Sequence, residues 1–228
     1  MQTVTLLQLR TAVRQRCNME NSQFVSDSEL TSYINHSLAE LYELIVQSYE
    51  DYYVKELDFS YSTSQLTTDT GYTLPTDFDK LKGVDFKGGA GEWCAINPFT
   101  FINRNTRASS FVFSGRSFFP DRQYRLCDNS IQIIPLGQSN GDYRMFYIPL
   151  FIPLSNDSDS TSMAFSGWDE YVTVDASIKC LQKEESDVSV LEMQKQALIA
   201  RISSVALGRD AGQPKQVQMV RNRTDGWW

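Results

Sequence analysis

Two kinds of hydrophobic period divide this chain, and their order limits the folds that it can adopt. Apolar residues recur at helical spacing in two N-terminal segments, 6–17 and 27–51, and again in 167–184 and 189–208. Between 55 and 150 they alternate with polar residues, as in strands. A helix pair alone would leave its apolar stripe uncovered. The order therefore predicts an α+β protein, in which a bundle of about four helices is interrupted by an antiparallel β-rich insertion.

Capping signals mark where the helices begin. Thr5 with Gln8 has the spacing of a capping box, and Ser26 with Glu29 repeats it before the second helical segment. Ser189 marks the start of the last segment, and Gly208 is expected to end it.

Short apolar runs predict the strands of the insertion, and turn residues separate them. The runs are Leu57–Tyr61, Val84–Phe86, Phe111–Phe113, Tyr124–Cys127, Ile131–Ile134 and Met145–Ile148. The glycines of residues 88–91 predict a hairpin loop, and Asn140 with Gly141 predicts a second hairpin turn between IQIIP and YRMFYIP. Residues 99–103 are expected to form one helical turn.

These patterns divide the chain into four regions. We expect a discontinuous helical bundle in 1–54 and 163–208, and a β-rich domain in 55–152. Residues 153–162 have no apolar period and are expected to form a polar, solvated linker. Residues 209–228 form an extended C-terminal tail.

Composition excludes several classes of function. The 228 residues carry a net charge of −7, which disfavours a sequence-reading nucleic-acid binder. No apolar run is long enough for a membrane helix. Four cysteines without paired spacing and a single histidine predict neither a zinc site nor a disulfide framework, so we expect no metal and no cofactor.

No constellation of residues predicts catalysis. His36 lies within a helical segment with no arrangement of partners that would make it a base. The acid pairs Asp77 with Asp79, Asp169 with Glu170, and Glu184 with Glu185 keep a glycosidase-like reading open. Helix-start or solvated charges explain the last two pairs better. GGAG lacks the Lys-Ser/Thr of a phosphate loop, and residues 156–159 lack the glycine and glutamate of a calcium loop. We therefore expect no enzyme.

The first two helices have opposite charge. Arg10, Arg14 and Arg16 make the first basic, whereas the second carries acids, including Glu40 and Glu43, without a lysine or arginine. Acids near the far end of a helix oppose its dipole, so a compensating group is expected, and the basic first helix is the nearest candidate.

The tail is the segment most suggestive of a partner. Between Arg209 and Trp228 it has four basic residues against two acids, and it ends in two tryptophans. Tryptophan and arginine are frequent interface anchors. We expect the tail to dock into a groove on another subunit.

The order of four runs resembles a known family. FVSDSELTSYINHSLAELYELI, YTLPTDFDKLKGVDF, DYRMFYIP and GWDEYVTVDASIKCLQKEESDVSVLEMQKQAL follow one another as in the head-to-tail adaptor (connector) proteins of tailed bacteriophages. The resemblance spans about residues 6–210.

This resemblance implies a structural protein of the virion neck, assembled in the host cytoplasm. It implies a homo-oligomeric ring, usually of twelve copies, which binds the portal protein, extends the DNA channel toward a downstream tail or tail-tube protein and has no membrane contact. Double-stranded DNA would pass through without sequence-specific contact. In relatives a C-terminal segment reaches the portal, which maps here to 213–228. The residues expected to dock are Gln213, Pro214, Val217, Met219, Val220, Arg221, Arg223, Trp227 and Trp228.

Charged residues are the candidates for ring and channel contacts. A ring needs two different surfaces, which the basic first helix and the acidic second helix could provide, and an acidic channel wall would let DNA slide. The candidates are Arg10, Arg14, Arg16, Glu40, Glu43, Glu184 and Glu185. Two alternatives stay open: another neck or tail-tube protein that docks through its β domain, and a cell-wall hydrolase.

Overall fold

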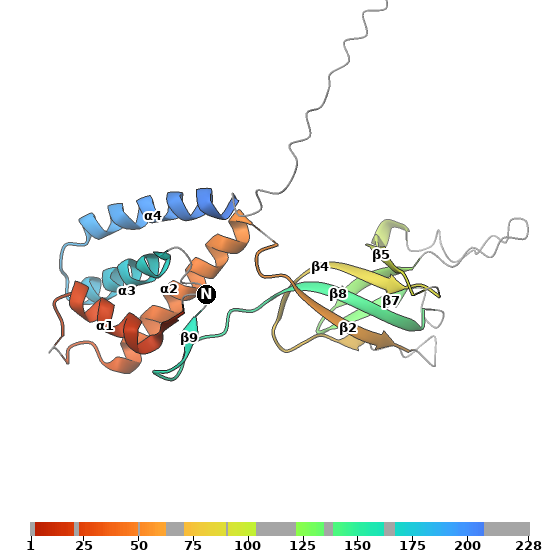
Figure 1. The fold of residues 1–228 in the computed structure, drawn as a ribbon, viewed down its shortest axis with the longest axis horizontal. Coiled ribbons are helices and arrows are strands. Elements are labelled where there is room, and N and C mark those ends of the chain that lie inside the picture. The colour runs from red at the N-terminus through yellow and green to blue at the C-terminus, as the bar shows by residue number, and fades with distance from the viewer. Residues whose placement is uncertain are drawn as a thin grey trace, which may run out of the picture. The chain divides into compact units, whose positions relative to one another are not determined.

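The chain folds into two compact units, each of which is described by itself. The computed structural model describes residues 3–20, 23–49, 51–62, 71–89, 91–103, 122–134, 139–161 and 167–207. One unit comprises Met1–Tyr49 with Asp157–Trp228, and the other comprises Glu50–Asn156. The described part of the first is mainly helical and that of the second is mainly β-sheet (Figure 1). The predicted α+β class is confirmed.

The helical unit is built from four α-helices and a small ribbon in its described residues. They are β1 (Val4–Thr5), α1 (Leu6–Arg16), α2 (Asp27–Ser48), β9 (Ser160–Thr161), α3 (Asp169–Lys183) and α4 (Ser189–Leu207). The four helices agree with the predicted segments. α2 and α3 contact each other, and both α1 and α4 pack against this pair. The core contains Leu6, Leu9, Val13, Leu30, Ile34, Leu38, Leu41, Ile45, Tyr171, Val172 and Val174.

The helix starts follow the predicted capping chemistry in two of three cases. The Gln8 amide donates to Thr5 Oγ1 over 3.3 Å, and the Thr5 amide donates to Gln8 Oε1 over 2.9 Å, which completes the capping box. Ser26 accepts from the Glu29 amide over 3.3 Å. α4 begins at Ser189 as predicted, but its amide donates to the carboxylate of Asp187 over 3.0 Å. An acid before the helix therefore satisfies this amide.

The prediction that residues 153–162 form a solvated linker fails at Ser160 and Thr161. Ser160 and Thr161 form β9, which pairs antiparallel with β1. The carbonyl oxygen of Asp159 accepts from the Leu6 amide over 2.9 Å. The segment thus supplies acceptors to the start of α1. Sequence period gave no sign of this, because the contacts use backbone atoms and a strand of two residues.

The β unit contains one seven-stranded sheet among its described residues. Its elements are β2 (Lys55–Tyr61), β3 (Tyr72–Thr73), β4 (Phe78–Lys87), β5 (Trp93–Pro98), the 3₁₀ turn η1 (Phe101–Asn103), β6 (Gln123–Cys127), β7 (Ser130–Ile134) and β8 (Gly141–Pro149). The strand order is β2-β8-β4-β5-β6-β7-β3. Its core consists of Phe59, Tyr61, Leu74, Val84, Ile131, Ile133, Tyr143, Met145 and Tyr147.

One hairpin loop and one helical turn of this unit match the sequence analysis. β4 and β5 pair antiparallel, and the Gly88 amide donates to the Glu92 carbonyl over 2.8 Å, which confirms the hairpin at 88–91. Asp128, with a φ of 51°, turns the chain between β6 and β7. η1 lies within the predicted turn at 99–103. The predicted run Phe111–Phe113 lies outside the described residues.

β5 was not predicted, and one strand pair breaks the antiparallel pattern. The residues of β5 read WCAINP and lack an alternating apolar face, so the period of a strand is absent. β5 and β6 pair parallel, whereas the other pairs of this sheet are antiparallel in the described residues.

The predicted hairpin at Asn140 and Gly141 is wrong. β7 and β8 are not neighbours, because β8 enters the sheet between β2 and β4. Gly141 is required for a different reason. Its φ is 150°, and a Cβ there would lie 2.8 Å from Cε2 of Phe86. The glycine therefore lets β8 begin against an aromatic ring of β4.

Substitution of Gly141 tests this explanation. We expect Gly141→Ala to lower the free energy of unfolding of the β unit by about 1–3 kcal/mol, because the backbone enters a region that alanine disfavours. Gly83→Ala is the matched control within β4. A Cβ at Gly83 would meet nothing within 4 Å, so the change should stay within about 0.5 kcal/mol. Urea unfolding followed by circular dichroism measures both, and equal effects would contradict the explanation.

Candidate functional site

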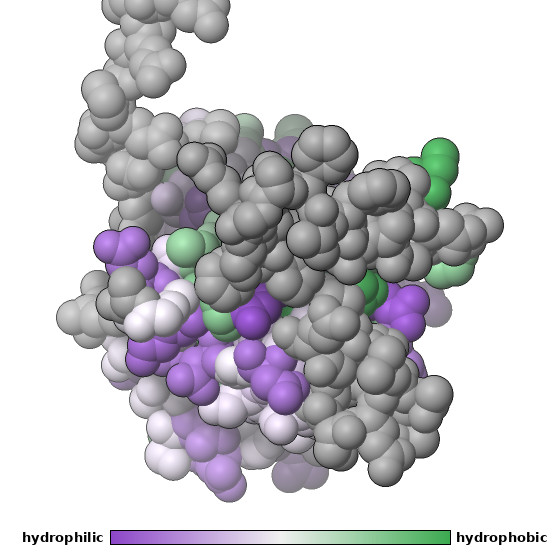
Figure 2. Space-filling model, turned by 90° about the vertical axis from the view of Figure 1, so that its right-hand side faces the viewer, coloured by the Kyte–Doolittle hydropathy of each residue, from purple (hydrophilic) through white to green (hydrophobic). Residues whose placement is uncertain are grey.

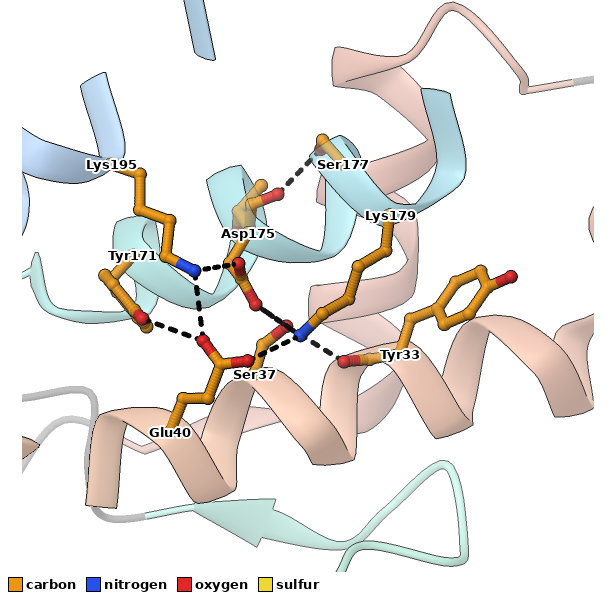
Figure 3. A network of polar contacts seen from close by, with 9 residues as sticks. Tyr33, Ser37, Glu40, Tyr171, Asp175, Ser177, Lys179 and Lys195 are labelled. Atoms are coloured by element: carbon orange, nitrogen blue, oxygen red, sulfur yellow. Dashed lines mark hydrogen bonds and ion pairs between the residues drawn. The ribbon is translucent and has the colours of Figure 1, made fainter. Parts of the chain in front are cut away.

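A cluster of charged side chains joins α2, α3 and α4 inside the helical unit (Figure 3). Glu40 comes from α2, Asp175 and Lys179 from α3, and Lys195 from α4. Two carboxylates and two ammonium groups balance one another in charge. We call these four residues the interhelical ion network.

The contacts of the network are short and shared. Lys195 Nζ donates to Asp175 Oδ1 over 2.6 Å and to Glu40 Oε2 over 3.0 Å. Lys179 Nζ donates to Asp175 Oδ2 over 2.5 Å and to Glu40 Oε1 over 3.2 Å. The Ser37 hydroxyl donates to Asp175 over 2.6 Å, and the Tyr171 hydroxyl donates to Glu40 over 3.1 Å. Each carboxylate is therefore held from more than one helix.

Because Asp175 is buried, its ion pairs contribute more to stability than exposed pairs would. The Asp175 side chain is only 3% exposed. Burial raises the pKa of Asp175, but hydrogen bonds from Lys179, Lys195 and Ser37 outweigh burial and hold the pKa below its ordinary value of 3.8. Burial likewise raises the pKa of Glu40, and the two lysines bring it below 4.5. Both carboxylates are therefore charged near neutral pH and need the two lysines.

The network adds to the apolar packing that holds α4. Of the described side chains of α4, Ile202 and Ala206 are buried, and Leu191, Leu198 and Ile199 are half-buried. Val190 and Met193, in the first half, are 59% and 67% exposed. Lys195 is the side chain of this half that reaches α2 and α3 by ion pairs. The network thus positions the helix that leads into the C-terminal tail.

The three arginines of α1 are engaged within the chain. Arg10 pairs with Asp157, Arg14 donates to Asp27 over 2.8 Å, and Arg16 donates to Glu170 over 2.6 Å. The Arg14 hydrogen bond lowers the pKa of Asp27. α1 therefore compensates the acid at the start of α2. Farther along α2, compensation for Glu40 comes from lysines of α3 and α4.

The other predicted ring and channel residues lie on different elements of the helical unit. Glu43 is exposed on α2, and Glu184 and Glu185 are exposed at the end of α3. Glu40 belongs to the network. The nine predicted docking residues of the tail lie outside the described residues. The roles of all these residues in a ring or channel stay predictions.

The residues weighed for catalysis have other surroundings. His36 is exposed on α2. Asp77 accepts from Lys55 over 2.8 Å and from the Tyr147 hydroxyl over 3.1 Å. All four cysteines are free thiols. Within the described ranges, no group of three or more histidine, cysteine, aspartate or glutamate side chains could hold a metal ion.

None of the helices described is both long enough and apolar enough to span a membrane. Figure 2 shows one face of the molecule, on which the described side chains are mainly hydrophilic and hydrophobic ones occur in small groups.

Sequence reasoning missed Asp175, Lys179 and Lys195. A signal for the first two was present. In the stretch VTVDASIKC, an aspartate and a lysine stand at i and i+4 among small and apolar residues of a helix. An opposite-charge pair on an otherwise buried helix face indicates a buried ion pair. Lys195 carried no such sign, because its partners are on other helices.

The fold and the charge arrangement define a class of protein: an α+β protein in which a cluster of charged side chains connects three helices of one unit and has a structural role. Comparison with family models gives the family. The chain matches the SU10 adaptor protein model over residues 4–220, and it belongs to that family. The resemblance inferred from the order of the runs is confirmed. The chain is a phage adaptor protein, and this membership supports a structural, virion-associated role. No curated protein matches it.

Removal of Lys195 tests whether the network holds α4. We expect Lys195→Met to lower the free energy of unfolding of the helical unit by about 1.5–3 kcal/mol, because charge-assisted hydrogen bonds to two carboxylates are lost. Amide hydrogen exchange should show faster exchange in the first half of α4. Lys55→Met removes an exposed pair in the β unit and should cost at most about 1 kcal/mol. Unchanged exchange in α4 would contradict the proposed role of the network.

Acid should weaken the same network. Because the folded pKa values of Asp175 and Glu40 lie below 3.8 and 4.5, their contribution is complete above those values and is lost as pH falls through the lower folded values. We expect the free energy of unfolding of the helical unit to fall steeply below pH 4.5. Glu40→Gln should flatten this dependence, whereas Glu43→Gln, one turn farther along α2, should not. Denaturant unfolding at a series of pH values measures the difference, and equal slopes would refute it.

Proposed function

We propose that this chain is a head-to-tail adaptor of the virion neck. It assembles as a ring of about twelve copies beneath the portal, extends the DNA channel and connects the head to a downstream tail protein. Membership in the SU10 adaptor protein family is the observation that carries the proposal. In this proposal the ring assembles in the host cytoplasm.

The C-terminal tail is the portal-binding element in this proposal. α4 ends at Leu207 and leads directly into residues 208–228. Two terminal tryptophans and the basic residues of this segment supply anchors of the kind that interfaces use. The interhelical ion network supports this role, because it fixes the helix from which the tail departs.

The exposed acids are candidates for the channel wall. Glu43 on α2 and Glu184 and Glu185 after α3 are exposed and carry the negative charge that would repel DNA phosphates. Arg10, Arg14 and Arg16 remain candidates for ring contacts only through the parts of their side chains not used within the chain. A wall of one sign would let the duplex slide without sequence-specific contact.

The β unit offers a second contact surface. Phe101 and Ile102 in η1 are 66% and 79% exposed, and Leu126 in β6 is also exposed. Contiguous exposed apolar patches mark interaction sites, whereas single scattered apolar side chains are normal on a surface. We assign this surface to the downstream tail component. No observation favours the hydrolase, because Asp77 and Glu170 are engaged in pairs within the chain.

The mass of the complex with portal rings tests the proposal. We expect the full chain to bind one copy per portal subunit. Deletion of Gln213–Trp228 should leave a folded protein that no longer adds mass to the portal ring, because the anchors are gone. Native mass spectrometry measures the bound copies, and circular dichroism checks the fold.

Two further variants make the result specific. Trp227→Ser with Trp228→Ser keeps the length and charge of the tail and should also lose portal binding. Asn222→Ala with Thr224→Ala is the matched control and should retain it. Full binding by the deletion variant would remove the tail from the mechanism. A complex without one-to-one stoichiometry would overturn the ring beneath the portal.

A further inference from the structure

The outward face of α4 carries an apolar stripe that nothing in the described structure covers. Val190, Met193 and Ala197 lie at helical spacing on this face, and all three are exposed. Met193 also lines an open groove of about 720 Å³ between α3 and α4. Ile178 is the other apolar residue of this groove, and the rest of its lining is polar or charged and includes the interhelical ion network: Glu40, Asp175, Lys179, Gln182, Ser189, Glu192, Lys195 and Gln196. We call the apolar stripe, with the edge of the groove beside Met193, the α4 surface.

Acidic residues flank the N-terminal end of this surface. Glu184, Glu185 and Asp187 lie between α3 and α4, and Glu192 lies in the first turn of α4. All four are exposed. A segment that fits the α4 surface should therefore combine apolar side chains with positive charge.

The chain's own C-terminal tail has this composition. Residues 209–228 contain four basic and two acidic residues, and their apolar side chains include Val217, Met219 and the two terminal tryptophans. The tail thus complements both the apolar stripe and the acids beside it.

The length and starting point of the tail permit this contact within one subunit. The tail starts where α4 ends, and Val190 lies 17 residues back along the helix, about 26 Å away at a rise of about 1.5 Å per residue. Residues 208–228 can span up to about 70 Å when extended. Gly208 and Gly212 allow the chain to reverse direction. Because site and segment share one chain, their effective concentration is on the order of millimolar.

We propose that in the unassembled subunit residues 208–228 fold back along α4 and cover the α4 surface. The tryptophans and neighbouring apolar side chains cover the stripe of Val190, Met193 and Ala197, and the basic residues face the acids of the α3–α4 turn. This inference rests on the proposed function in one respect: portal binding withdraws the tail from α4. The free subunit then hides its portal anchors, and the portal exchanges an intramolecular contact for an intermolecular one.

Methionine methyl resonances of the full chain test the contact directly. With methyl-labelled methionine, we expect the Met193 resonance to be displaced upfield by a tryptophan ring. Trp227→Ser with Trp228→Ser should return it to the position of a solvent-exposed methionine. Met145, buried in the β unit, is the internal control and should not move. Met193→Leu assigns the resonance.

Charge variants and dilution complete the experiment. Glu185→Lys with Glu192→Lys should reduce the Met193 displacement, whereas Glu20→Lys, an exposed acid that follows α1, should leave it unchanged. An identical Met193 resonance with and without the tryptophans would overturn the proposal. A displacement that disappears on dilution would also overturn it, because the tail would then come from a second copy.

Portal binding separates this inference from the proposed function. If the double tryptophan variant fails to bind portal rings but Met193 never moves, the tail is a portal anchor and the α4 contact is refuted. If Met193 moves but portal binding is unaffected, the contact stands and the portal role of the tail fails.

Discussion

The position of α4 depends on two carboxylates that are charged because two lysines reach them. Asp175 is almost fully buried, so its negative charge would destabilise the folded state if Lys179 and Lys195 did not pair with it. Because both lysines must stay beside Asp175 to neutralise it, Lys195 also positions the first half of α4. Hydrophobic burial acts mainly at Ile202 and Ala206. α4 is thus attached by apolar packing, which is most complete at Ile202 and Ala206, and by the ion pairs of Lys195, which make its position specific.

Charge neutralisation follows a rule throughout the helical unit. The acids of α2 have no basic partner on their own helix, so each helix that packs on α2 supplies one. α1 gives Arg14 to Asp27, α3 gives Lys183 to Glu29 over 2.7 Å, and α3 and α4 give the two lysines to Glu40. The basic side chains are mostly consumed in this way, whereas acids such as Glu43 stay exposed. In the described helical unit the unpaired negative charge therefore lies on exposed residues such as Glu43.

The helices were predictable because each has a long apolar period and a local start signal. Thr5 and Ser26 mark helix starts through contacts within four residues, which a sequence displays directly. The errors concern contacts between distant segments. β8 pairs with β2 and β4, so Asn140 and Gly141 could not reveal their role without knowledge of Phe86. β9 is formed by backbone pairing with β1, which leaves no mark on composition. The ion network was half visible, as an i, i+4 pair in α3, and half hidden, because Lys195 meets its partners only in the folded bundle.

An adaptor needs both a stable fold and exposed surface for its partners, and different side chains of α4 meet these two needs. Ion pairs from Lys195 add to the apolar packing of Ile202 and Ala206, and Val190 and Met193 remain exposed. A helix held only by apolar contacts would bury such side chains in the core of its own subunit. Since the tail begins at the end of the same helix, the apolar stripe and the segment that can cover it are held close together by covalent connection. α4 therefore combines buried apolar side chains at Ile202 and Ala206 and ion pairs from Lys195 with exposed apolar side chains at Val190 and Met193, and exposed apolar groups that lie together mark interaction sites.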